Sequence, residues 1–221
     1  MKQTPFNGSR GFTLLELIAV VGIIAFLATL LYPTLKTAVI RADQSAGINK
    51  LRSIGQAMML YTGDHDGYLP GPLWPGQMIE YDPNREGRLV RELAPYLGYP
   101  ESNETYLAKD FASKMLLSRT PAAALPLVRP YVLNLDCTNA SGELVRPFGN
   151  LAASEPGTPM KHVNLPPEIR AQWMMSDADQ AHPRVLGASW RAYTPTKPIY
   201  GKSRNALFYD LHAEILPLNA F

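Results

Sequence analysis

A carboxylate stands at the edge of a long apolar segment near the start of the chain. Glu16 directly precedes residues 17–35, and no residue of that segment is charged. A charged side chain in hydrocarbon costs about 3 kcal/mol or more, so it is rarely present there without a role. The position of Glu16 therefore marks it as a candidate functional residue.

Ordinary interpretations compete with this one. A secretory signal peptide or a plain membrane anchor would normally explain such an amino terminus, but Glu16 argues against both. An Ala-x-Ala type cleavage site is also missing after the apolar segment. Thr13 and Glu16 have the spacing of a capping box, in which Thr caps a helix and Glu returns to the amide of the cap. Capping and function are compatible, because a carboxylate near a helix start is also close to any newly created chain terminus.

A second group of residues has the chemistry of a metal site. Oxygen and imidazole ligands of the kind that bind divalent cations occur toward the carboxy terminus, at Asp177, Asp179, His182, Asp210, His212 and Glu214. Nothing in the sequence brings these residues together. An acidic turn at 177–182 and a polar strand face at 210–214 are the favoured interpretation.

The sequence does not predict an enzyme. Cys137 is the single cysteine and has no recognisable catalytic partner, so it also forms no intrachain disulfide. A Gly-x-Ser-x-Gly elbow and a glycine-rich phosphate loop are both missing from the sequence.

Two elements must position the amino-terminal residues. Residues 12–34 are apolar over about the 20 residues that a membrane-spanning helix needs. Beyond Pro33 the pattern becomes amphipathic and predicts that the helix continues to residue 62, with Gly63 as its stop. Pro33 predicts a kink, because proline removes one helical hydrogen bond. Lys2 and Arg10 precede the span, so the amino terminus is expected in the cytoplasm and the bulk of the chain on the opposite side.

Charge argues against nucleic-acid binding. Lys2 and Arg10 are the only charged residues before Gly11, and without them 21 minus 2 basic residues balance 19 acidic ones. Twenty prolines and sixteen glycines predict a loop-rich domain with short strands over residues 63–221. We expect an α+β fold, in which the long helix packs on a small antiparallel β-sheet.

Short elements are predicted inside this domain. Residues 63–70 are dense in turn formers, and a plain turn is favoured there over a calcium loop. The spacing of apolar residues predicts helices at 88–96 and 111–117, and strands at 131–135, 144–148 and 173–175. Alternation of apolar and polar residues over 207–215 predicts one strand with one buried face.

The run Gly11-Phe12-Thr13-Leu14-Leu15-Glu16-Leu17 resembles the class III signal of type IV pilins and type II secretion pseudopilins. Residues 63–70 and 205–216 resemble the corresponding segments of the H-X9-DG branch of these proteins, with Leu211 in the place of a glycine. That departure weakens the prediction of a tight turn at this point.

The resemblance implies a processing pathway and a set of partners. A prepilin peptidase/N-methyltransferase would remove a leader of residues 1–11, cutting between Gly11 and Phe12, and would methylate Phe12. Glu16 would neutralise the amino terminus of a neighbouring subunit, because an ammonium group offsets much of the cost of a buried carboxylate. Partners would be other copies, other pilins or pseudopilins and the inner-membrane assembly machinery. A pilin-like fold is implied, with the domain in the periplasm.

The leading hypothesis is therefore a structural filament subunit of the bacterial inner membrane. A membrane-tethered or filament-tip binding module is the alternative, and a metal-dependent, membrane-anchored hydrolase is less favoured. The resemblance implies no cofactor, although some pseudopilins hold calcium in a carboxy-terminal loop. Asp177 and Asp179 are the weak candidates for such a site.

Overall fold

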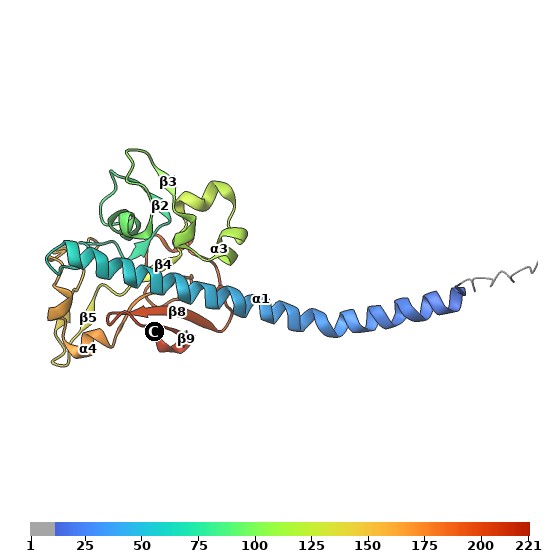
Figure 1. The fold of residues 1–221 in the computed structure, drawn as a ribbon. Helices are drawn as coiled ribbons and strands as arrows, with labels where there is room; N and C mark the ends of the chain where they lie inside the picture. The colour runs from blue at the N-terminus through green and yellow to red at the C-terminus, as the bar shows by residue number, and fades with distance from the viewer. Residues whose placement is uncertain (1–11) are drawn as a thin grey trace, which may run out of the picture. The chain divides into compact units, whose positions relative to one another are not determined.

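Helix α1 is the longest element of the chain and runs from Leu14 to Asp64. It appears in a computed structural model that describes residues 12–221 (Figure 1). The long predicted helix is confirmed, and Pro33 lies inside it. A kink at Pro33 stays a prediction. The chain divides within this helix into two units, one reaching Arg41 and the other comprising Ala42–Phe221.

The first unit carries the apolar segment. Helix α1 is long and apolar enough there to cross a membrane. The large apolar side chains between Phe12 and Tyr32 are exposed. An exposed apolar surface of this extent is unfavourable in water. A lipid bilayer would cover it, and the segment is long enough to span one.

The second unit is built on an antiparallel sheet of five strands in the order β1-β4-β7-β8-β9. The five strands are β1 (Gly76–Gln77), β4 (Tyr131–Leu133), β7 (Trp173–Asp177), β8 (Ser203–Phe208) and β9 (Ala213–Pro217). The strands predicted at 131–135 and 173–175 are thus confirmed, and the α+β class with them.

Residues 42–64 of α1 pack on this sheet through one face. Ile48, Leu51, Ile54, Met58 and Tyr61 recur every three or four residues, and all are buried. Two glycines on this face let the helix approach strand β8. A Cβ on Gly47 would lie 2.6 Å from the amide nitrogen of Asn205, and one on Gly55 would lie 3.3 Å from Leu207.

Short elements complete the unit. Two-stranded sheets are formed by β2 (Glu80–Tyr81) with β3 (Tyr106–Leu107) and by β5 (Cys137–Thr138) with β6 (Leu144–Val145). The short α-helices are α2 (Leu89–Leu93), α3 (Lys114–Arg119) and α4 (Pro167–Arg170). Short 3-10 helices lie at Pro95–Leu97, Lys109–Phe111, Ala122–Leu127, His162–Asn164, Arg191–Tyr193 and Leu218–Ala220.

A helix is present in the segment predicted at 111–117, but it begins later than predicted. A 3-10 turn ends at Phe111, and helix α3 begins only at Lys114. The side chain of Ser113 accepts a hydrogen bond from the N–H of Leu116 at 3.1 Å and so caps a new helix. The predicted helix at 88–96 is confirmed as α2 and the 3-10 turn that follows it.

The turn at 63–70 is confirmed, although Gly63 does not stop the helix. Helix α1 ends at Asp64, and the chain reverses where Asp66 and Gly67 have φ values of 53° and 84°. The N–H of Gly67 donates to the carbonyl of Thr62 at 2.8 Å, which satisfies one of the last helical carbonyls.

The prediction of one continuous strand over 207–215 is wrong. Strand β8 ends at Phe208 and β9 begins at Ala213, so the segment is an antiparallel hairpin. Leu211 holds the turn at φ 71°, a conformation that costs a residue with a Cβ about 1–2 kcal/mol. The Asp210 side chain supports the turn by accepting from the N–H of His212 at 3.1 Å. The tight turn therefore persists without the glycine.

Candidate functional site

The start of helix α1 is organised by Thr13 and Glu16. The backbone N–H of Thr13 and its hydroxyl both donate to Oε2 of Glu16 at 2.9 Å. In return, the N–H of Glu16 donates to the Thr13 hydroxyl at 3.3 Å. This reciprocal arrangement is the capping box that the spacing predicts. It places the carboxylate at the first turn of the helix, where the helix dipole favours negative charge.

One oxygen of this carboxylate is left for another partner. Both bonds from Thr13 end on Oε2, and within residues 12–221 no hydrogen bond or ion pair ends on Oε1. Phe12, which is 78 % exposed, precedes the capping residue. Gly11 and the rest of the predicted leader lie outside the described residues. Glu16 is therefore held in place while it keeps the capacity to receive a cation.

The two acidic residues considered for calcium have different surroundings. Asp179 is 1 % exposed and forms a bidentate ion pair with Arg204 of β8. Its two carboxylate oxygens accept from Nε and Nη2 of Arg204 at 2.6 and 3.0 Å. Arg204 thus takes both oxygens that a calcium ion would need.

Asp177 is buried at the end of β7, and its carboxylate accepts from the backbone N–H of Asn205 at 2.7 Å. Burial is the main cause that raises the pKa of Asp177 to about 7. The Asn205 N–H lowers this pKa, and Asp179 raises it again. Asp43 of helix α1 also contributes to the increase. A carboxylate of this kind holds a proton near neutral pH.

The backbone N–H of His182 donates to the carbonyl of Asp179 at 3.0 Å, but among the described residues its imidazole forms no hydrogen bond with either aspartate. Its ring packs in a cluster with the rings of Trp173 and Phe221, at centroid distances of 5.4 and 4.9 Å. Its Nδ1 accepts from the N–H of Arg184 at 3.1 Å. Burial, and to a smaller extent the charge of Arg204, lower the pKa of His182 to about 4. The imidazole is therefore neutral in the folded protein.

The structure separates the remaining candidates from these residues. Asp210 pairs with His212 in the exposed hairpin turn, and Glu214 is exposed on the edge strand β9. Among residues 12–221, three or more His, Cys, Asp or Glu side chains are nowhere close enough to hold one metal ion. A calcium site at Asp177 and Asp179 stays a prediction.

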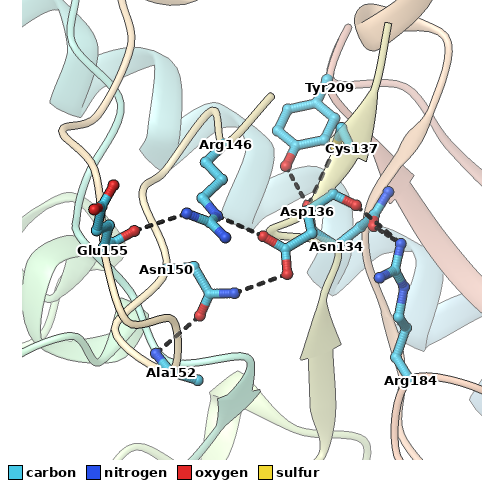
Figure 2. Close-up of polar contacts among 9 residues, drawn as sticks. All are labelled: Asn134, Asp136, Cys137, Arg146, Asn150, Ala152, Glu155, Arg184 and Tyr209. Carbon is cyan, nitrogen blue, oxygen red and sulfur yellow. Dashed lines mark hydrogen bonds and ion pairs between the residues drawn. The ribbon is translucent and has the colours of Figure 1, made fainter. Parts of the chain in front are cut away.

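Cys137 lies inside a network of polar contacts (Figure 2). Its thiol donates to the carbonyl of Asn134 at 3.5 Å, and the Tyr209 hydroxyl donates to the same oxygen. Burial raises the pKa of the Cys137 thiol to about 11. A thiol with this pKa is a weak nucleophile at neutral pH.

Sequence reasoning missed Arg204, the residue on which the buried acids depend. Arg204 and Asn205 are neighbours in β8, so their side chains lie on opposite faces of the sheet. The side chain of Arg204 contacts Asp179, and that of Asn205 contacts α1. The available signal was a charged residue directly before the apolar end of a strand, residues 206–208, where burial requires a partner for the charge.

Comparison with known protein families gives one match, at the amino terminus. Residues 6–32 match the family model described as the prokaryotic N-terminal methylation motif. The matched segment contains Phe12, Thr13, Glu16 and the first part of the apolar helix. No curated protein and no solved structure matches the chain. The match is consistent with a member of the type IV pilin and pseudopilin family and supports membrane anchoring through α1.

Proposed function

We propose that this chain, which carries the N-terminal methylation motif found in type IV pilin-like proteins, is a structural subunit of a type II secretion pseudopilus or a type IV pilus-like filament. The observation that carries the proposal is the combination of the matched motif with Glu16 at the first turn of an exposed apolar helix. A carboxylate at the edge of a membrane span costs free energy, so it is not expected in a helix that serves only as a membrane anchor.

Processing comes first in the proposed pathway. Prepilin peptidase/N-methyltransferase cleaves the bond between Gly11 and Phe12 and methylates the new α-amino group. Cleavage at this bond creates an ammonium group on Phe12, the residue that precedes the helix cap at Thr13. The new charge therefore arises at membrane depth, close to the level of Glu16 along the helix.

Assembly follows from the cost of leaving these charges alone in lipid. The Thr13 contacts hold Oε2 of Glu16, and Oε1 is directed to no other group among residues 12–221. An ammonium from a neighbouring subunit at Oε1 offsets the desolvation of both charges. The apolar segments then pack side by side in the filament centre, while the domains of residues 42–221 lie outside it. Before assembly these domains lie in the periplasm.

The experiment separates the charge of Glu16 from its capping role. Glu16→Gln keeps an oxygen that accepts from Thr13, because glutamine also occupies this place in capping boxes. Glu16→Ala removes both functions. Each variant is produced in the native host, and intact mass spectrometry establishes whether it begins with N-methylated Phe12. The amount in sheared or purified filaments is then measured.

We expect both variants to be processed and both to fall at least about tenfold in filament incorporation, since a buried ion pair cannot form without the carboxylate. Thr13→Val is the matched control, because it weakens the cap and keeps the charge, and it should assemble nearly normally. Normal assembly of Glu16→Gln together with failure of Glu16→Ala would assign the residue to capping alone.

A further inference from the structure

A cavity of about 470 Å³ opens beside the end of strand β4. Its lining is mixed: Pro75, Leu133 and Leu135 are apolar, while Asp136, Arg146 and Arg184 provide charge. All of these residues belong to the unit of residues 42–221. Figure 2 shows that the two arginines approach the Asp136 region from opposite sides.

One arginine of this cavity is already paired. Nε of Arg146 donates to Oδ1 of Asp136 at 2.7 Å, and the Asn150 side chain donates to Oδ2 at 3.0 Å. Nη1 of Arg146 also donates to the carbonyl of Glu155 at 2.7 Å. Both oxygens of Asp136 are therefore occupied, and its charge is balanced by Arg146.

Arg184 is held in place without being neutralised. Its Nη2 donates to the side-chain oxygen of Asn134 at 2.8 Å and to the carbonyl of Asp136 at 3.0 Å. Both acceptors are uncharged. In the described part of the chain, Arg184 forms no ion pair and its Nε and Nη1 donate no hydrogen bond. Two arginines and one aspartate leave the cavity with one positive charge.

The chemistry of the cavity selects its ligand. A guanidinium binds a carboxylate through two parallel hydrogen bonds, and the contacts of Arg184 already restrict its rotation, which lowers the entropy lost on binding. A single excess positive charge matches a monoanion better than a phosphate dianion. The lining contains no aromatic side chain on which a sugar ring could stack. The few apolar side chains of the lining, such as Pro75, give the methylene groups of an acidic side chain a surface to contact.

We propose that this cavity binds the carboxylate of an aspartate or glutamate side chain from a second protein chain, and that Arg184 receives it. Asp136 and Asn150 position Arg146 and close the cavity on one side, and Arg184 supplies the charge. The inference concerns a surface of the domain and does not depend on the role of Glu16 in assembly.

The test uses the full chain in detergent micelles, with ¹⁵N-labelled arginine. The Nε–H resonances of the arginines are followed by NMR during titration with N-acetylglutamate amide. N-acetylglutamine amide is the uncharged control probe. Arg191 is the matched control residue, because it is exposed and its Nε donates to one neutral acceptor, the carbonyl of Gln180, at 3.0 Å. Loss of a signal in Arg184→Lys assigns the Arg184 resonance.

A saturable shift of the Arg184 resonance with the glutamate probe supports the proposal. The accompanying shift of the Arg146 resonance, which the variant retains, should saturate with at least about tenfold weaker affinity in Arg184→Lys, because lysine cannot form the bidentate contact. Unchanged backbone spectra show that this variant is folded, and Ser154→Ala, on the rim, should bind nearly as well. Equal shifts of Arg184 and Arg191, or equal effects of the two probes, would overturn it. Tighter binding of inorganic phosphate would overturn the choice of carboxylate, and tighter binding of glucuronate would overturn the choice of a protein ligand.

Discussion

The two stretches of helix α1 have the same backbone structure and opposite surroundings. In residues 14–41 the large apolar side chains are exposed, whereas in residues 42–64 one face is buried against the sheet. Their glycines show the contrast most directly. A Cβ on Gly22 would meet no atom within 4 Å, but one on Gly47 would collide with Asn205 and the Tyr200 hydroxyl at 2.6 Å. Local interactions are thus enough to form the helix in both stretches. Whether a face of the helix is buried depends on the elements that pack against it.

The charged residues of the two units follow the same division. Glu16 has partners only from its own helical turn, and it keeps an oxygen without one among the described residues. Asp179 has a complete internal partner in Arg204. The first unit therefore depends on groups outside the chain for its stability, and the second depends on contacts within itself. Three sets of substitutions test this difference.

The largest expected effect comes from Arg204→Ala. It leaves the carboxylate of Asp179 buried without a partner, and we expect the free energy of unfolding to fall by about 3–5 kcal/mol. The matched variant in the first unit is Arg41→Ala, whose side chain is exposed and should cost less than about 0.5 kcal/mol. Chemical denaturation of the full chain in micelles, followed by tryptophan fluorescence, measures both.

A double variant separates the lost pair from lost packing. Asp179→Leu combined with Arg204→Met replaces both charges by apolar groups of similar size, so it should recover much of the stability. Equal losses in Arg204→Ala and Arg41→Ala would contradict the division between the units.

A second, smaller effect concerns the pH dependence of stability. Asp177 has a pKa of about 7 in the folded protein and about 3.9 when unfolded, so the folded state binds the proton more tightly. The free energy of unfolding therefore falls as pH rises between these values, by at most about 1.4 kcal/mol per pH unit. His182 acts in the opposite direction, because its pKa is about 4 when folded and about 6.5 when unfolded.

Asp177→Asn removes the contribution of Asp177 to the pH dependence of stability and keeps that of His182. Relative to the natural chain, we expect the variant to gain stability progressively above pH 4, by about 3 kcal/mol at pH 6 and about 4 kcal/mol at pH 8. Denaturation at several pH values measures the difference between the two proteins. A constant difference across pH 4 to 8 would contradict the raised pKa of Asp177.

The smallest effect comes from the glycines of α1. Each Gly→Ala change favours helix formation by about 0.5–1 kcal/mol. At Gly47 the collision with two buried polar groups should outweigh this gain and cost about 2 kcal/mol in total. At Gly55 the nearest atom is the movable Cδ1 of Leu207 at 3.3 Å, so the stability of the domain should change little. Gly22→Ala should leave that stability unchanged. Stabilisation by Gly47→Ala would show that the helix is not packed on β8 as closely as described.

Local patterns predicted much of the fold. The apolar segment, the amphipathic continuation and the Thr13–Glu16 spacing each depend on neighbouring residues, and the long helix and its capping box are confirmed. The alternating pattern at 207–215 misled the prediction because it does not distinguish one strand from two strands joined by a short turn. Leu211 carries no sign of its left-handed conformation, which glycine would have indicated.

The sequence by itself determined the helix, its apolar span and the position of a carboxylate at its start, because these follow from residues within a few turns of one another. The tertiary structure alone decided which acids are paired. Asp179 meets Arg204 across 25 residues of chain, and Arg184 meets Asn134 across 50. Such pairs depend on strand order and register, which packing of the whole domain selects and which short-range patterns do not encode.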